Sequence, residues 1–161
     1  MKNLSPTKNR LVIIDGNSLV NRAYYAIQKP MMNKEGLYTH AVYGFLNMLN
    51  KILADYEPAY IVVAFYRKAP TFRHLEYQEY KAGRKGMPPE LAMQLPILKD
   101  VLDAMRIKRL EMDGFEADDL IGTVVKRAEE AGLSPYIISG DRDVLQLVSD
   151  TTSVILTKKG I

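Results

Sequence analysis

Three carboxylates lie within four residues of the sequence, at Glu116, Asp118 and Asp119. They stand directly before an apolar run with helical spacing that begins at Leu120. On a helix that begins here, Glu116 and Asp119 are three residues apart and share a face. Like charges beside a buried stripe repel one another and resist desolvation, a conflict that a hard divalent cation with oxygen ligands removes. The pattern therefore indicates a Mg²⁺ or Mn²⁺ site; the alternative is that acidic residues favour a first helical turn through the helix dipole alone.

Two further acids follow segments that are predicted to be strands. Asp15 comes directly after the apolar run 11–14, and Asp141 follows the run 136–139 after one glycine. In parallel α/β sheets, ligands bind beyond the carboxyl ends of the strands. We therefore expect Asp15, Asp141 and the acidic cluster at Glu116 to meet at one edge of a sheet. Turn or helix-capping duty is the alternative for Asp15 and for Asp141, but all three positions together favour a metal site.

The elements that must position these acids alternate along the chain. Buried or half-buried strands are predicted at 11–14, 59–65, 108–111, 136–139 and 153–156. Helices are predicted at 19–27, 41–55, 88–105 and 116–131, with a short one after the turn at 140–143 through Leu147. This alternation predicts an α/β fold with a parallel sheet that has helices on both faces. The length of 161 residues predicts a single domain.

Composition excludes several kinds of site. The chain has no cysteine, so it has neither disulfides nor zinc–thiolate sites, and its two histidines, His40 and His74, make an imidazole-rich metal site unfavourable. The segment 1–10 is polar and mildly basic, which predicts no signal peptide, and no run of eighteen apolar residues occurs. These observations predict a soluble cytoplasmic protein.

The segment between the second strand and the next helix, about 66–87, is basic. From residue 67 to residue 85 it carries six Lys or Arg against two Glu, although the formal net charge of the whole chain is only +3. Aromatic residues lie among these charges, at Phe72, Tyr77 and Tyr80. A basic segment that faces an acidic cluster suits a phosphate-bearing substrate bridged by metal. The alternative is a solvated charged loop, but the length of the segment and its aromatics favour a function.

With these residues in view, the chain resembles the 5′→3′ exonuclease domain of bacterial DNA polymerase I, a member of the flap-endonuclease (PIN-like) superfamily. The resemblance runs from about residue 10 to the end and rests on six segments in order: 11–18, 41–45, 68–74, 80–84, 114–119 and 140–147. Any one of these motifs is weak, whereas six in this order are highly specific.

The resemblance implies a three-layer PIN-like (Rossmann-like) fold, with a mostly parallel sheet, helices on both faces and a helical arch at about 66–87. It implies a divalent-metal-dependent 5′→3′ exonuclease and flap endonuclease that hydrolyses DNA phosphodiesters in replication and repair, with two Mg²⁺ or Mn²⁺ ions. The implied partner is DNA with a 5′ flap, nick or gap. Family members are joined to a DNA polymerase or work beside one, and the implied location is the bacterial cytoplasm at the nucleoid.

The resemblance also assigns roles to individual residues. The first metal would be bound by Asp15, Glu116, Asp118 and Asp119, and the second by Asp141 and Asp143. The phosphate next to the metals would contact Lys81 and Arg84. The DNA strand would contact Arg67, Lys68, Arg73 and Lys85, with His74 as a further phosphate donor and Tyr77 or Tyr80 stacked on a base. For His74 the alternative is a surface histidine with no role.

Tyr24 and Tyr25 stand where the family carries aromatics near the substrate, and for one of them we expect packing against the sheet instead.

Two departures from the family pattern bear on activity. The family has aspartate directly after Phe65, where this chain has Tyr66. Because a phenol is neutral near pH 7, we expect weaker binding of the first metal and sharply reduced cleavage. The chain also ends at Ile161, where the family continues with a helix–turn–helix element that grips duplex DNA and supplies two further aspartates. We therefore expect residues 1–161 to be the N-terminal part of a longer nuclease domain.

Three other functions compete with a metal-dependent 5′-nuclease. Tyr66 and the absent segment favour a DNA- or metal-binding module that does not cut. A small PIN-like ribonuclease also uses clustered acids on an α/β sheet, but the long basic segment and the segment 140–147 argue against it. A plain nucleotide-binding α/β domain is the least favoured, because the sequence has no phosphate-cradling glycine loop.

Overall fold

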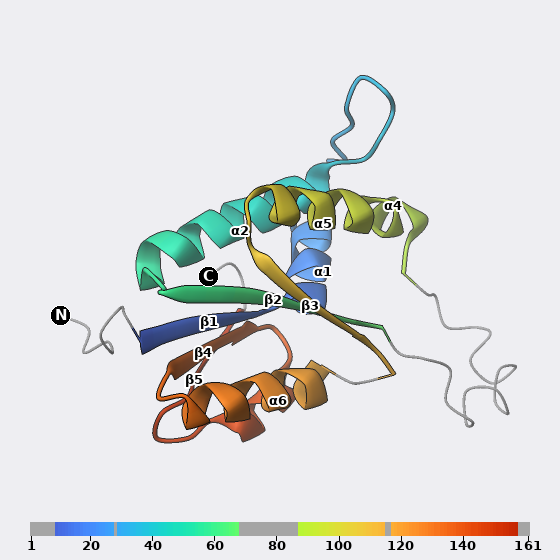
Figure 1. Cartoon of the computed structure of the whole chain (residues 1–161). Helices are drawn as coiled ribbons and strands as arrows, with labels where there is room; N and C mark the ends of the chain where they lie inside the picture. Colours follow the sequence, from blue (N-terminus) through green and yellow to red (C-terminus); the bar gives the residue numbers. More distant parts are fainter. Residues whose placement is uncertain (1–8, 28, 68–86, 115–116, 158–161) are drawn as a thin grey trace, which may run out of the picture.

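Five parallel strands form one sheet, in the order β3-β2-β1-β4-β5 (Figure 1). The structure is a computed structural model that describes residues 9–27, 29–67, 87–114 and 117–157. Its strands are β1 (Arg10–Asp15), β2 (Tyr60–Arg67), β3 (Lys108–Asp113), β4 (Ser134–Ser139) and β5 (Ser153–Leu156). Its helices are α1 (Gly16–Ala26), α2 (His40–Tyr56), α4 (Pro89–Ala92), α5 (Gln94–Ala104), α6 (Ala117–Glu130) and the 3₁₀ helix η2 (Arg142–Leu147).

The strand order places a topological switch beside β1. From β1 the chain adds β2 and then β3 on one side, and afterwards returns to add β4 and β5 on the other side. In the register, Asp15 pairs with Ala64 of β2, and Ile14 pairs with Ile138 of β4. Ligands of open α/β sheets bind outside the carboxyl ends of the strands at such a switch. For this chain that position is the end of β1 next to the end of β4.

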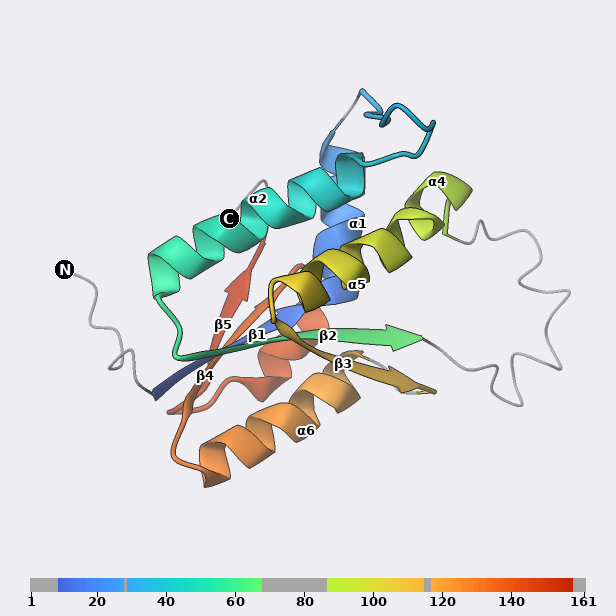
Figure 2. The same cartoon turned by 45° about the horizontal axis from the view of Figure 1, so that its top comes forward.

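Each face of the sheet packs against its own layer of helices (Figures 1 and 2). On one face Val12 and Ile14 of β1 join a core with residues of α1, α2 and α5, among them Phe45. On the other face Leu11 and Ile13 pack against α6, among its residues Ile121. This alternation along β1 is what a strand buried on both faces requires. The predicted three-layer α/β architecture is confirmed.

The helices begin and end slightly differently from the prediction, for local reasons. Helix α1 begins at Gly16 rather than Leu19, because the side chain of Asp15 caps it by accepting a hydrogen bond from the backbone N–H of Ser18. The single helix expected from Pro88 is divided into α4 and α5 at Met93. Pro96 explains the break, since it has no N–H to donate to the carbonyl four residues earlier.

The segment of the predicted arch, about 66–87, overlaps the end of β2 by two residues. Tyr66 and Arg67 are the last residues of β2, which continues the sheet beside β3. Residues 68–86, the rest of the predicted arch, lie outside the described part of the chain. In the described part, no helix is long and apolar enough to cross a membrane.

Candidate metal centre at the carboxyl edge of the sheet

Asp15 is the last residue of the central strand and is fully buried. Both of its carboxylate oxygens accept hydrogen bonds. Oδ1 accepts one from the backbone N–H of Ser18, at 3.2 Å, in the first turn of α1. Oδ2 accepts one from the hydroxyl of Ser139, at 2.7 Å, at the end of β4. The carboxylate is therefore held between the first turn of α1 and the end of β4, at the topological switch.

Asp141 is brought to the same place by the chain that leaves β4. Its backbone N–H donates to Ser139 Oγ at 3.0 Å, and its own Oδ1 accepts from the N–H of Asp143 at 2.9 Å. A second bridge lies alongside, in which Gly140 N donates to Ser18 Oγ at 2.7 Å. The structure thus brings Asp15 and Asp141 together, as the sequence predicts from their positions after two strands.

The electrostatics of this edge are unfavourable for a carboxylate. Burial raises the pKa of Asp15, and the negative charge of Asp141 raises it further, while the hydrogen bonds from Ser139 and Ser18 act in the opposite direction. A bound cation would reverse this balance, because it stabilises the ionised form of both acids. The oxygen donors and the excess of negative charge fit a hard divalent ion.

Helix capping, the alternative reading of these two acids, is also present in the structure. Asp15 caps α1, and Asp141 caps η2. Capping accounts for Oδ1 of each carboxylate. It does not account for the second hydrogen bond of Asp15, from the strand on the far side of the switch, or for the complete burial of this acid.

The acidic cluster that opens α6 is described only in part. Asp119 is exposed in the first turn of α6, where its carbonyl oxygen accepts a hydrogen bond from Thr123. Glu116 and the side chain of Asp118 lie outside the description, and Asp143 is exposed in η2. Among the described side chains, no three acidic or histidine groups are close enough to hold one metal together. Of the predicted ligands with described side chains, Asp15, Asp119, Asp141 and Asp143, the hydrogen bonds of Ser139 join Asp15 and Asp141, and the metal-binding roles of all six acids stay predictions.

Tyr66 lies on the same face of the sheet as Asp15. It stands two residues after Ala64, the partner of Asp15 in the register, and it packs half-buried against the core beneath α6. Its backbone is fixed by Asn17, which donates to the carbonyl oxygen of Tyr66 at 2.8 Å and accepts from its N–H at 3.2 Å. Position 66 is thus held at the edge of the candidate centre by contacts that do not depend on its side chain.

The predicted DNA contacts fall almost wholly outside the described residues. Arg67 ends β2, but its side chain is outside the description. Tyr24 packs half-buried against the core, while the neighbouring Tyr25 is 67% exposed, so the expected packing role for one of the two is confirmed. The other predicted contacts that lie outside the description are Lys68, Arg73, His74, Tyr77, Tyr80, Lys81, Arg84 and Lys85.

Sequence reasoning missed the residues that support the acids. Ser139 joins β4 to Asp15, Ser18 joins α1 to the segment after β4, and Asn17 joins α1 to Tyr66 of β2. Ser18 and Asn17 belong to a turn cluster after the first strand, and their polarity next to Asp15 was the available signal. Nothing local distinguishes Ser139 from an ordinary strand residue, since its partners are distant in sequence.

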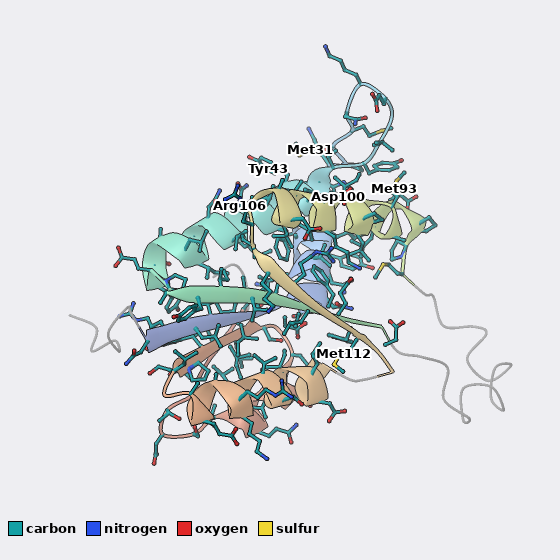
Figure 3. The ribbon with its side chains drawn as sticks, in the orientation of Figure 1. Met31, Tyr43, Met93, Asp100, Arg106 and Met112 are labelled. Carbon is teal, nitrogen blue, oxygen red and sulfur yellow. The ribbon has the colours of Figure 1, made fainter. Side chains whose placement is uncertain are left out.

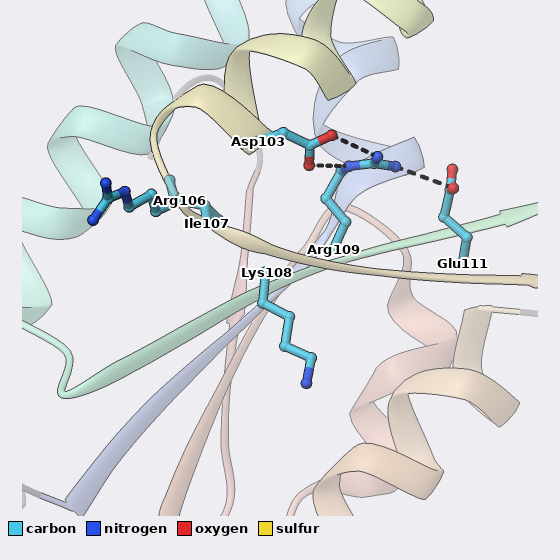
Figure 4. A pocket seen from close by; sticks show the side chains of 6 residues that line it. All are labelled: Asp103, Arg106, Ile107, Lys108, Arg109 and Glu111. Atoms are coloured by element: carbon cyan, nitrogen blue, oxygen red, sulfur yellow. Dashed lines mark hydrogen bonds and ion pairs between the residues drawn. The ribbon is translucent and has the colours of Figure 1, made fainter.

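A different hollow, of about 360 Å³, lies at the start of the edge strand β3 (Figure 4). There Arg109 forms ion pairs with Asp103 and Glu111. The side chains of Arg106 and Lys108 point away from each other (Figure 4). The hollow thus has no converging set of cations for an anion, and its charges tie α5 to β3.

Large apolar side chains are exposed in more than one place. Met31, Tyr43 and Met93 lie on the side of the molecule formed by α2 and the helices that follow β2, whereas Met112 lies near α6 (Figure 3). The acidic pair at the switch is a separate feature, in which Asp15 is buried and Asp141 is half-buried.

Comparison with known proteins places this chain in a family. Residues 10–161 match the 5′-3′ exonuclease, N-terminal resolvase-like domain. The chain belongs to this 5′-3′ exonuclease family, as its resemblance to the domain of bacterial DNA polymerase I predicted.

The matched relatives are much longer than this chain. DNA polymerase I of Geobacillus stearothermophilus is 52% identical over 155 residues, and that of Bacillus subtilis is 46% identical over the same length. In both cases the match covers 96% of this chain and 17–18% of the relative. The chain therefore spans less than a fifth of the length of these relatives.

Solved structures share the fold at low sequence identity. The T5 5′-exonuclease with bound zinc ions matches with a TM-score of 0.65 and 21% identity, covering 91% of this chain and 55% of that one. The T5 flap endonuclease in a pseudo-enzyme–product complex with DNA and metal ions matches with a TM-score of 0.62, also at 21% identity, and covers 91% of this chain and 54% of that one. These likenesses establish the resolvase-like α/β fold.

Proposed function

We propose that this chain is the metal-binding part of a 5′→3′ exonuclease and flap endonuclease that hydrolyses DNA phosphodiesters, as part of a DNA polymerase I-like protein. The observation that carries the proposal is the joining of Asp15 and Asp141 at the topological switch, through Ser139, with the pKa of Asp15 raised by burial. Support comes from the family match and from relatives named DNA polymerase I. The proposed substrate is DNA with a 5′ flap, nick or gap, and the proposed setting is replication and repair in the bacterial cytoplasm.

In this function Asp15 and Asp141 would hold Mg²⁺ or Mn²⁺, together with the acids whose side chains the structure does not describe or leaves exposed. A divalent cation bound there supplies Lewis-acid activation of the phosphate and of the attacking water. The chain itself contributes a fixed, buried carboxylate at the end of β1, and the hydrogen bonds of Ser18 and Ser139 prevent this carboxylate from turning. The other proposed metal ligands are Glu116, Asp118, Asp119 and Asp143.

The basic segment would supply the complementary charge. Lys81 and Arg84 are proposed to contact the phosphate, where cations offset the charge that develops during cleavage. The cations that flank them are proposed to track the DNA backbone. This part of the proposal rests on the sequence resemblance.

Tyr66 favours a second candidate function, a domain that binds metal and DNA without cutting. The half-buried phenol shares its sheet face with Asp15 and brings no negative charge near pH 7. An aspartate at this position would add a carboxylate beside the acidic pair. We therefore propose that cleavage by the present chain is weak and is increased by Tyr66→Asp.

A cleavage assay on a labelled 5′-flap duplex with Mn²⁺ tests both functions. The variants are Tyr66→Asp alone and Tyr66→Asp combined with Asp15→Asn, Asp119→Ala or, as a carboxylate control at the α5–β3 corner, Asp103→Asn. We expect Tyr66→Asp to cleave, Asp103→Asn to leave that cleavage unchanged, and the other two substitutions to abolish it. Flap binding measured in Ca²⁺ accompanies each assay.

The possible outcomes separate the two functions. If Tyr66→Asp binds the flap but cleaves no faster than the unsubstituted chain, the non-cutting function is favoured. If none of the variants binds flap DNA or cleaves it, the nuclease proposal for this chain is wrong. Faster cleavage of single-stranded RNA than of the flap would instead favour a PIN-like ribonuclease.

A further inference from the structure

One buried hydroxyl joins the two acids at the switch. Ser139 is the last residue of β4 and is fully buried. Its Oγ donates to Asp15 Oδ2 at 2.7 Å and accepts from the backbone N–H of Asp141 at 3.0 Å. A hydroxyl has one proton to donate and can accept as well. Here the hydroxyl donates its proton to the carboxylate of Asp15 and accepts a hydrogen bond from the backbone N–H of Asp141.

These hydrogen bonds form a series that fixes several candidate ligands at once. Asp141, whose backbone is held by Ser139, accepts from the N–H of Asp143 through its own Oδ1. The rotamer of Asp15, the start of the segment after β4 and the first turn of η2 therefore depend on the same oxygen atom. Nearby, a hydrogen bond from Gly140 to Ser18 links the segment after β4 to the first turn of α1.

The hydroxyl is not needed to hold β4 in the sheet. The strand is already paired with β1 along its length, with Ile14 opposite Ile138, and with β5 on its other side. The carbonyl oxygen of Ser139 also accepts a backbone hydrogen bond from Thr157 at 3.0 Å. Removal of the hydroxyl therefore leaves the backbone ladder intact and changes the hydrogen bonding of the acids.

We propose that Ser139 is a positioning residue for the metal centre, whose hydroxyl sets the placement of the Asp15 carboxylate relative to Asp141 and thereby the affinity for a divalent cation. This inference rests on the proposed function of the same edge. Groups that hydrogen-bond to metal-ligating carboxylates orient them, and their loss typically weakens metal binding or activity by about 10–100-fold.

Binding of Mn²⁺, measured by the decrease of the free-ion signal in electron paramagnetic resonance, tests the inference without reference to cleavage. Ser139→Ala removes the hydroxyl, Ser139→Thr keeps it, and Asp15→Asn removes the carboxylate. The matched control is Thr152→Val. It removes another buried hydroxyl that donates to a carboxylate, from Thr152 Oγ1 to Glu129 Oε2 at 2.9 Å, away from the switch. The urea midpoint of the metal-free protein is measured for each variant.

We expect Ser139→Ala to bind Mn²⁺ about 10–100-fold more weakly than the unsubstituted chain. Ser139→Thr is expected to recover most of this affinity, and Thr152→Val to leave it unchanged even where its urea midpoint falls. If the added methyl of Ser139→Thr lowers the midpoint below that of Ser139→Ala, Ser139→Cys takes its place. A thiol is similar in size to a hydroxyl but is a weak hydrogen-bond donor. The Mn²⁺ affinity of Ser139→Cys should therefore lie between those of the unsubstituted chain and Ser139→Ala.

Three results would overturn the inference, and they can be told apart. If Asp15→Asn weakens Mn²⁺ binding and Ser139→Ala does not, the metal centre stands and Ser139 has no positioning role. If Ser139→Ala and Thr152→Val lower affinity equally, in proportion to their loss of stability, the effect is structural and the inference also fails. If the unsubstituted chain binds no Mn²⁺, or Asp15→Asn binds as well as it does, the proposed function fails and this inference fails with it.

Discussion

Two corners of the sheet hold carboxylates in opposite ways. At the corner of α5 and β3, Arg109 donates to both oxygens of Asp103 at 2.8 Å, and Glu111 pairs with Arg109 and Lys99. These bonds lower the pKa values of Asp103 and Glu111. At the end of β1, burial raises the pKa of Asp15, whose partners are a hydroxyl, a backbone N–H and a second acid nearby.

The difference separates a structural charge cluster from a candidate site. Acids that are exposed and matched by cations are satisfied by the protein itself, and such pairs contribute little beyond local order. An acid that is buried beside another acid is stabilised in its ionised form by a ligand that brings positive charge. Perturbation of this second kind is the one that marks functional sites. The corner of β1 and β4 is therefore the place to test for metal.

The largest expected effect is on metal binding. Asp15→Asn removes the buried carboxylate from the proposed ligand set. We expect Mn²⁺ affinity to fall by more than about 100-fold, because loss of a ligand costs more than loss of a group that only hydrogen-bonds to a ligand. Asp103→Asn removes a carboxylate of the same type from the other corner and should leave the affinity unchanged. Calorimetric titration with Mn²⁺ measures both. Equal losses of Mn²⁺ affinity in the two variants would show that the metal does not distinguish the two corners.

The next effect is on packing at the candidate centre. A Cβ on Gly16 would lie 2.7 Å from Phe65 Cε1 and 2.9 Å from the carbonyl oxygen of Ala64, so α1 approaches β2 too closely for a side chain. We expect Gly16→Ala to lower the free energy of unfolding by about 1–3 kcal/mol.

Gly122→Ala in α6 is the matched control for this substitution. Among the described residues, its added Cβ would meet Leu147 Cδ2, at 3.4 Å. Because alanine favours a helix, we expect a gain of up to about 1 kcal/mol in the free energy of unfolding. Urea unfolding measures both variants. A Gly16→Ala variant as stable as the unsubstituted chain would contradict the close packing at this edge.

A smaller effect is expected from the backbone of the α5–β3 corner. Arg106 has a left-handed φ of 60° just after α5, a conformation that glycine adopts without the penalty of a Cβ. We expect Arg106→Gly to raise the free energy of unfolding by about 0.5–1 kcal/mol, and Glu57→Gly, at φ 42° after α2, to act similarly. Neither should change Mn²⁺ affinity. If Arg106→Gly lowers the free energy of unfolding instead, the contacts of the Arg106 side chain stabilise the fold by more than its left-handed backbone destabilises it.

The smallest effect should come from the exposed ion pairs, and it depends on pH. Because the folded-state pKa values of Asp103 and Glu111 are lowered, their contribution to stability is present above the ordinary values of 3.8 and 4.5 and is lost as the pH falls below them. Arg109→Met removes the shared cation. The difference between its urea midpoint and that of the unsubstituted chain should be full at pH about 7 and should shrink towards pH about 3. A difference that is constant over this range would contradict the pairing.

Much of the architecture follows from the sequence alone. Short apolar runs such as 11–14 and 136–139 favour strands covered on both faces, and helical spacing between the runs predicts the covering layers. An acid directly after such a run lies at the carboxyl end of its strand. This local rule was enough to place Asp15 and Asp141 at one edge, and the six motifs in order were enough to indicate the family, which the comparisons confirm.

The neighbours of those acids depended on the order of the strands. Ser139 reaches Asp15 because β4 returns to lie beside β1, a pairing between residues that are 124 positions apart. Asn17 hydrogen-bonds to Tyr66 because β2 lies beside β1, on the side away from β4. No local pattern of residue types encodes which strands are adjacent, since that is decided by the packing of the whole sheet between its helices. The sequence by itself therefore determined the acids and the edge on which they lie, and the tertiary structure decided which groups hold them there.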